Sequence, residues 1–173
     1  MDVTIRAEQP GDLDGIAEVV EAAFGQPSEA RLVEALRESD CFIPELSLVA
    51  LIDDRVVGHV MITTAWLQDG DERRPIANLA PLAVAPGLHR QGIGSALMGA
   101  VIARTKQRGE PLILLQGHPA YYPRFGFEHS VPLGIEFDLP DWAPSEAGQV
   151  LRLTAYDPTI RGKVVYPPAF DEL

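Results

Sequence analysis

The sequence has a single cysteine, few basic residues and no long apolar run. Cys41 is alone among 173 residues, so no disulfide can form within the chain and no cysteine cluster is available for zinc. Lysine and arginine number 14 against 25 aspartates and glutamates, a formal net charge of −11. This balance argues against nucleic-acid and anionic-membrane binding, both of which need positive charge. No stretch approaches the roughly 18 apolar residues of a membrane helix.

Length and composition favour one globular domain over residues 1–173. Hydrophobic residues make up 46% of the chain and charged residues 23%, which excludes a fully disordered chain and a fibrous repeat. A folded chain of 18.8 kDa buries about 70% of its extended surface, enough for one core. The N-terminal residues are polar and charged and contain no apolar signal segment. With one thiol and no export signal, we expect a cytoplasmic location.

Hydrophobic spacing predicts a mixed α/β fold. Apolar residues recur at helical intervals after Pro10, Pro27 and Gly92, and alternating or continuous apolar runs between these segments predict strands. We expect Ser28 to cap the second helix. Strands are expected at 3–6, 46–52, 55–66, 76–84, 112–115 and 149–155, helices over 13–24, 29–36 and 93–105, a short helix from Pro119, and a charged loop at 67–74. This order favours a mixed sheet with helices on its faces.

The segment 82–97 places glycines between a strand and a helix. Helix N-termini carry unpaired N–H groups and the positive end of the helix dipole, and glycines let a phosphate approach that backbone closely. Gly92, Gly94 and Ser95, with Arg90, therefore fit a pyrophosphate cradle. A tight strand–helix turn with no ligand explains the same glycines equally well.

Three better-known motifs do not fit this segment. The dinucleotide fingerprint needs a third glycine where Leu97 stands, and a P-loop needs a lysine that is absent. The nucleophile elbow needs glycines on either side of Ser95, where the sequence has Ile93 and Leu97.

The segment does resemble motif A of the GNAT superfamily of N-acetyltransferases, whose pattern is Gln/Arg-x-x-Gly-x-Gly/Ala. A second block over 117–127, with Tyr122 four residues before Gly126, resembles the end of motif B. Together with 162–170, the blocks are most similar to the YhbS-like subgroup. The resemblance implies a GNAT-like fold: a mostly antiparallel mixed sheet, splayed between its fourth and fifth strands, with helices on both faces. Pro81 agrees with a disrupted strand ladder there.

The resemblance implies acetyl-CoA as co-substrate, bound in the splay. The Leu82 N–H would polarise the thioester carbonyl, an oxyanion-type role. His89 departs from the family pattern, which has Gln or Arg there, and this puts the strength of cofactor binding in doubt. The cofactor-binding residues implied by position are Leu82, Ala83, Val84, His89, Arg90, Gln91, Gly92, Ile93, Gly94 and Ser95.

The resemblance indicates a general acid, but it does not indicate a general base. Tyr122 matches the family's general acid, although a packed tyrosine is the alternative. Many members have a glutamate where this chain has Asn78, which cannot take a proton. His118 is the best substitute base, because its ordinary pKa suits that work; capping of the helix from Pro119 is an equally good interpretation. A water chain, or an amine that arrives neutral, would also serve.

The favoured function is acetyl transfer from acetyl-CoA to a primary amine by direct attack in a ternary complex, without metal. The acceptor is a small molecule or a protein amine. A non-catalytic acyl-CoA-binding module and a longer-chain acyltransferase are the alternatives, and a homodimer and the role of 131–173 stay open. Weaker site candidates are His59, expected to be a satisfied core or face histidine, His129, Trp66, Trp142 and the acidic residues Asp69, Asp71 and Glu72.

Overall fold

A computed structural model describes residues 2–173, which form three α-helices and nine strands joined by short 3-10 turns. The helices are α1 Leu13–Phe24, α2 Ser28–Arg37 and α3 Ile93–Gln107. The strands are β1 Thr4–Ala7, β2 Phe42–Ile52, β3 Arg55–Asp69, β4 Glu72–Val84, β5 Leu112–Gln116, β6 Glu128–His129, β7 Ile135–Glu136, β8 Gly148–Arg152 and β9 Gly162–Val165.

All nine strands belong to one mixed sheet. Its main path runs β1-β2-β3-β4-β5-β8-β6, and β9 pairs with the outer part of β3 and with β7. Along the main path, only β4 and β5 are parallel neighbours. The mostly antiparallel mixed sheet agrees with the fold class expected from the sequence.

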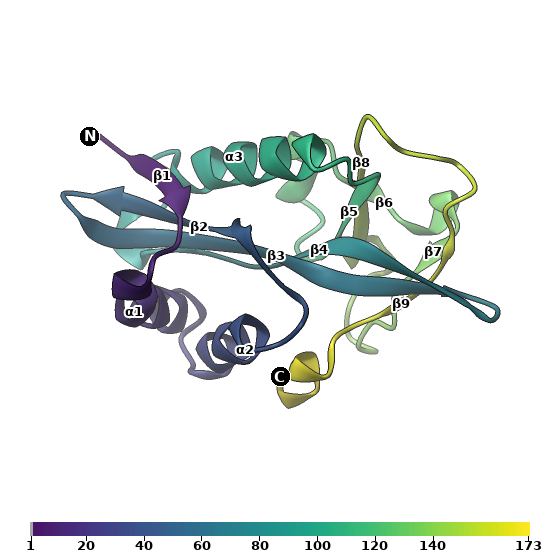
Figure 1. Ribbon diagram of the computed structural model, residues 1–173, viewed down its shortest axis with the longest axis horizontal. Helices are drawn as coiled ribbons and strands as arrows, with labels where there is room; N and C mark the ends of the chain where they lie inside the picture. Colours follow the sequence, from purple (N-terminus) through teal and green to yellow (C-terminus); the bar gives the residue numbers. More distant parts are fainter. Residues whose placement is uncertain (1) are drawn as a thin grey trace.

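Helices cover both faces of the sheet (Figure 1): α3 lies on one face, and α1 and α2 lie on the other. The period of two along β3 explains this, because Val60 and Ile62 pack in the cluster beneath α3 while Met61 packs with α1 and α2. A third apolar cluster continues on the α1/α2 face, where β3, β4 and β5 meet the C-terminal segment.

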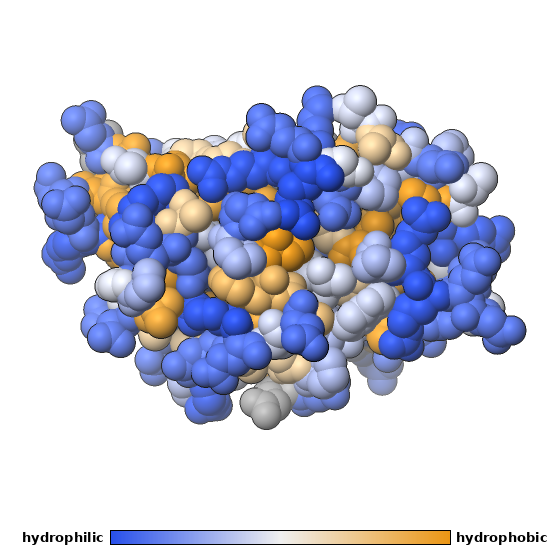
Figure 2. Space-filling model, in the orientation of Figure 1, coloured by the Kyte–Doolittle hydropathy of each residue, from blue (hydrophilic) through white to orange (hydrophobic). Residues whose placement is uncertain are grey.

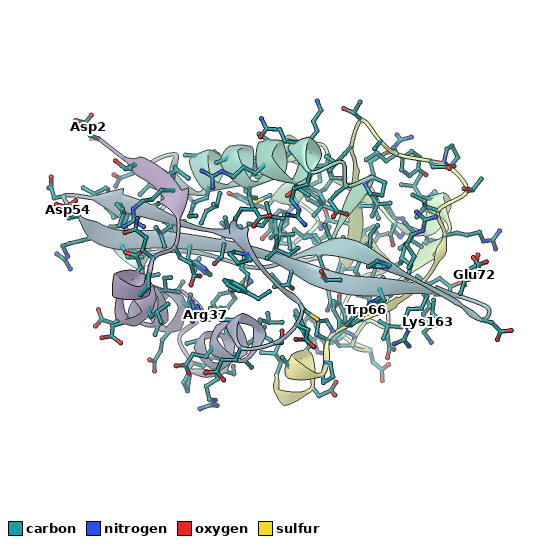
Figure 3. All side chains as sticks on the ribbon, in the orientation of Figure 1. Asp2, Arg37, Asp54, Trp66, Glu72 and Lys163 are labelled. Atoms are coloured by element: carbon teal, nitrogen blue, oxygen red, sulfur yellow. The ribbon has the colours of Figure 1, made fainter. Side chains whose placement is uncertain are left out.

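Three local expectations are wrong. The segment expected as a charged loop continues β3 and β4 as one long hairpin, with Asp69 opposite Glu72. Figure 3 shows Glu72 at the tip of this arm, with Trp66 and Lys163 along it. Ser28 does not cap α2, because its hydroxyl donates to the Glu29 carboxylate. Pro119 opens a turn rather than a helix, and the 3-10 helix begins later, at Tyr122.

The C-terminal segment completes the sheet. Its predicted strand is β8; β6 and β7 have two residues each, too few for a periodic pattern, and β9 was not predicted. The chain then ends in a 3-10 helix, Pro168–Glu172, that packs beside α2 (Figure 1). Hydrophilic residues cover most of the face in Figure 2, with apolar residues in smaller areas. Within the described residues, no helix is long and apolar enough to cross a membrane.

A buried polar network ties α2 to the first two strands. Arg37 donates to Glu8 at 2.6 Å, and the Ser47 hydroxyl donates to the same carboxylate. His59 Nε2 lies 3.0 Å from the Ser47 hydroxyl and 3.7 Å from Glu8. Burial opposes ionisation, but the contacts with His59, Arg37 and Ser47 outweigh it and lower the pKa of Glu8 to about 2. Burial also lowers the pKa of His59, so the network holds a carboxylate and a neutral imidazole.

This network predicts a loss of stability in acid. A carboxyl whose pKa falls from 4.5 to about 2 on folding stabilises the fold above pH 4.5, and that contribution is lost as the pH falls toward 2. Its full size is on the order of 3 kcal/mol. In urea unfolding between pH 7 and 3, Glu8→Gln is expected to be less stable at pH 7 and to show a flatter pH dependence than the wild type.

Glu128→Gln is the matched control, because the pair of Glu128 with Arg152 is exposed and contributes little. Equal pH slopes for wild type and Glu8→Gln would contradict the role of Glu8.

Candidate active site

The site begins where β4 and β5 part. Their parallel pairing covers Ala77, Asn78 and Leu79 of β4 and ends at the pair Leu79–Leu115. Beyond it, β4 carries one extra residue against β3, in the stretch that contains Pro81. Proline has no N–H to donate to a neighbouring strand. The strands therefore separate at the position that the sequence indicated.

Past this point, β4 presents polar backbone groups to the open side. The Ala85 N–H donates to the Val57 carbonyl of β3 at 2.9 Å. Because alternate residues of an antiparallel strand bond to the same neighbour, the N–H and C=O groups of Leu82 and Val84 point away from β3. Within the described part of the chain, no strand pairs with them on that side.

The N-terminus of α3 faces the same opening. Gly92 precedes the helix with φ +84°, and Arg90 has φ +63°. These left-handed conformations make the chain turn sharply just before α3. The first N–H groups of the helix have no partners within it and form an anion-binding end. A cavity of about 460 Å³ opens before them. Its lining includes Leu82, Ala83, Val84, Leu88, His89, Arg90, Gly92, Ile93, Gly94, Ser95, Tyr121 and Arg124.

Two arginines supply positive charge to this first cavity. Arg90 comes from the turn before α3, and Arg124 comes from the 3-10 helix after β5. Arg124 Nε donates to the Tyr121 carbonyl at 2.8 Å, and its guanidinium lies 4.4 Å from the Tyr121 ring centroid. His89 Nε2 instead donates to the Val84 carbonyl at 3.1 Å. His89 thus binds the strand of its own chain, and the arginines carry the charge toward the cavity.

A second cavity, of about 850 Å³, adjoins the first on the α1/α2 face. Phe24, Leu82 and Tyr121 border both cavities. The end of β5, the tail and the C-terminal 3-10 helix close the second cavity. Its remaining lining includes Glu29, Leu32, Asn78, Pro81, Leu115, Gln116, Gly117, His118, Tyr122, Asp138, Leu139, Pro140, Tyr166 and Phe170.

Tyr121 and Tyr122 project in different directions, as their adjacent positions require. Their ring centroids lie 4.9 Å apart and the ring planes are nearly perpendicular. The Tyr121 hydroxyl lies close to Gly94, where a Cβ would approach it to 3.0 Å. The Tyr122 ring packs against Gly117 and Phe127. It borders the second cavity but not the first. Burial raises the pKa of Tyr122 to about 12, so its phenol keeps its proton at neutral pH.

His118, the substitute base, and Asn78, which stands where many family members have a glutamate, both border the second cavity. His118 is exposed, and its Nδ1 accepts the Ala120 N–H at 3.1 Å. A neutral ring in this state carries its hydrogen on Nε2, so Nδ1 can take a proton only by giving up that bond. Asn78 is 1% exposed, and neither its side-chain oxygen nor its nitrogen has a hydrogen-bond partner among the described residues.

The remaining sequence candidates lie outside both cavities. His59 is buried in the core as expected, but only partly satisfied: Nε2 contacts Ser47, whereas Nδ1 has no partner in the described chain. Trp142 is 84% exposed, and Trp66 contacts Arg73 on the hairpin arm. His129 pairs with Ser145 at 2.9 Å. Neither Cys41 nor the acidic hairpin tip borders either cavity.

Sequence reasoning missed several lining residues. Phe24 ends the apolar repeat of α1, which gave no sign of a site, yet it is 42% exposed and borders both cavities. Arg124 stood inside the second motif, where its charge was the available signal. Asp138 gave no signal, and Tyr166 and Phe170 lie in the block 162–170 that contributed to the resemblance without any sign that they line a cavity.

Comparison with known proteins agrees with this geometry. A family model for the acetyltransferase (GNAT) domain matches residues 4–130. The N-acetyltransferases YhbS and YjhQ of Escherichia coli are 36% and 37% identical over 152 and 126 residues. These alignments cover 86% of this chain and 86% of YhbS, and 72% of this chain and 69% of YjhQ.

Two crystal structures of complexes are similar over nearly the whole chain. YhbS of Escherichia coli in complex with CoA has a TM-score of 0.88 and 31% identity, covering 98% of this chain and 92% of that one. A GNAT acetyltransferase of Brucella melitensis in complex with acetyl-CoA has a TM-score of 0.79 and 29% identity, covering 98% and 99%. The family match, the identities and the splayed sheet together establish that the chain belongs to the GNAT family of acetyltransferases.

Proposed function

We propose that this chain, acting as one domain, transfers the acetyl group of acetyl-CoA directly to a primary amine in a ternary complex. The observation that carries the proposal is the pair of adjoining cavities that meet at Leu82. The first cavity has cationic groups and free N–H groups, which suit an anionic cofactor. The second is larger and mostly apolar, which suits an acceptor.

The chain offers a continuous set of groups to acetyl-CoA. The backbone from Arg90 to Ser95 would hold the pyrophosphate at the α3 N-terminus. The Leu82 carbonyl and the Val84 N–H, which point away from β3, would bind the pantetheine arm as an added strand would; the Val84 carbonyl already accepts a bond from His89. The complexes of the two similar proteins with CoA and acetyl-CoA support this assignment.

Acetyl transfer then needs one attack and one proton delivery. The amine nitrogen attacks the thioester carbonyl carbon, and the Leu82 N–H stabilises the negative charge that develops on the carbonyl oxygen. The carbon–sulfur bond breaks, the thiolate takes the Tyr122 phenolic proton, and the amine nitrogen releases a proton as the amide forms. The Tyr122 phenolate then regains a proton from water, which restores the acid for the next turnover. The products are an N-acetylated amine and CoA.

The amine's proton leaves through the second cavity. Two carboxylates, Glu29 and Asp138, border that cavity and can receive the proton through water. His118 is the other group in reach, at the cost of its bond to Ala120. No covalent acetyl-enzyme is required, because Cys41 lies away from both cavities and burial raises the pKa of its thiol. A cytoplasmic location fits this single reduced thiol and the co-substrate.

A bulky side chain at Gly94 is expected to block cofactor binding. A Cβ at Gly94 would approach the Tyr121 hydroxyl to 3.0 Å at the mouth of the helix. Gly94→Val should therefore weaken CoA binding at least about tenfold in isothermal titration, a cost of about 1.4 kcal/mol. Gly99→Val is the control: it lies in the same helix with no atom within 4 Å of its Cβ, and it should bind CoA normally. Unchanged affinity in Gly94→Val would place the cofactor elsewhere.

Removal of the Tyr122 hydroxyl is expected to slow turnover and spare binding. Loss of a general acid lowers rates by roughly 10²–10⁴. Tyr122→Phe should show this loss in kcat, measured by thiol release with a panel of primary amines, with wild-type affinity for CoA. Tyr156→Phe, which lies outside both cavities, should keep full activity.

The same assay distinguishes an acetyltransferase from a non-catalytic acyl-CoA-binding module. Because the pKa of Tyr122 is about 12, wild-type kcat should not fall between pH 7 and 10 through loss of the acid. Full activity in Tyr122→Phe would exclude its role as acid. CoA binding with no turnover on any amine would favour the non-catalytic module.

A further inference from the structure

Three buried polar atoms, on Asn78 at the second cavity and on its cross-strand neighbour Thr63, have no partner within the described chain. They are the side-chain oxygen and nitrogen of Asn78 and the hydroxyl of Thr63. Both residues are almost completely buried. Buried polar groups in native proteins are nearly always hydrogen-bonded, so a cluster of unpaired ones calls for a ligand or water.

The sheet register brings these atoms to one place. Thr63 of β3 and Asn78 of β4 are direct cross-strand partners, so their side chains lie on the same face. That face is the one covered by α1 and α2, because Met61, two residues before Thr63, packs in the α1/α2 cluster. Ala65 and Ile76, two residues further out, pack in the third cluster. The polar pair thus lies between two apolar clusters, on the face where Asn78 borders the second cavity.

The rest of the cavity limits which acceptors fit. Phe24, Leu32 and the stacked rings of Tyr166 and Phe170, 4.9 Å apart, provide an apolar wall. The lining also contains Glu29 and Asp138 but neither lysine nor arginine within the described residues. A carboxylate on the acceptor would meet like charges there, whereas an amine would be attracted.

The polar pair lies within a small molecule's length of the reacting centre. Leu82 and Asn78 are opposite Val60 and Thr63, which are three residues apart on β3. That spacing is about 10 Å along an extended strand. An amine beside Leu82 and a second polar group beside Asn78 can therefore belong to one small acceptor.

We propose, building on the acetyl transfer above, that Asn78 and Thr63 recognise a neutral carboxamide on an acceptor amine with an apolar body. A carboxamide offers an N–H donor and a C=O acceptor in one plane, so it can pair with both ends of the Asn78 amide. An ester leaves the Asn78 oxygen unpaired, and a carboxylate does so and is repelled as well. The acceptor class is the amide of an apolar amino acid.

The test compares three acceptors of the same body: phenylalaninamide, phenylalanine methyl ester and phenylalanine. Amide and ester carry amines of similar basicity, so the ratio of their kcat/KM values isolates the carboxamide N–H. The wild type should prefer the amide to the ester by at least about tenfold and use phenylalanine least, because a site built for a donor rejects analogues that lack it.

Asn78→Leu and Thr63→Val remove the polar atoms with little change of shape. Replacing unpaired buried groups by apolar ones is not expected to destabilise the fold, so both variants should keep the wild-type Tm and CoA affinity. The amide-to-ester ratio should fall to near one in Asn78→Leu and fall partly in Thr63→Val. Thr105→Val is the control, since that buried hydroxyl donates to Val101 within α3 and should leave the ratio unchanged.

The outcomes separate this inference from the proposed function. Acetylation of these amines without amide preference, or with a preference that survives in Asn78→Leu, would overturn the carboxamide site and leave acetyl transfer intact; an ordered water on the polar pair would give that result. Absence of acetylation with any primary amine, despite CoA binding, would overturn both. Titration of phenylalaninamide into the CoA-loaded protein gives a readout without turnover: wild type should bind it more tightly than Asn78→Leu.

Discussion

The separation of β4 from β5 after Leu79 and Leu115 is the constraint on which the rest of the site depends. Where β4 pairs with β5, its polar backbone groups form hydrogen bonds with the strands on both sides. Once they part, the N–H and C=O groups of Leu82 and Val84 have no neighbouring strand on that side in the described chain. His89 bonds to the Val84 carbonyl, and the other backbone groups at this opening favour an extended ligand, because such a ligand replaces the missing strand.

The α1/α2 face of the sheet holds buried polar groups of two kinds. The carboxylate of Glu8 is neutralised by Arg37 and accepts a hydrogen bond from Ser47, so its charge is balanced within the fold, although His59 Nδ1 of the same network has no partner in the described chain. Asn78 and Thr63 are buried to the same degree but have no such partners within the described residues. The paired Glu8 carboxylate supports the fold, whereas the unpaired atoms of Asn78 and Thr63 lie beside a cavity and are the groups proposed above to recognise a ligand.

Long-range packing assembles the second cavity from segments that are far apart in the sequence. Phe24 and Glu29 come from the N-terminal helices, His118 follows β5, and Tyr166 and Phe170 come from the end of the described chain. The first cavity draws mainly on one contiguous stretch, from Leu82 to Ser95. This difference explains why the sequence indicated most of the residues that line the first cavity, and few of those that line the second.

The sequence by itself determined the helices, the long strands, the glycine turn before α3 and the resemblance to GNAT acetyltransferases. Those features are local, because a helix period or a glycine spacing depends on neighbours in the chain. Only the tertiary structure decided that 67–74 is a hairpin, that Arg124 joins the cationic end of the first cavity, and that Asn78 lies opposite Thr63. Strand register, and the packing of the tail on α2, arise from contacts between distant residues, which local patterns do not specify.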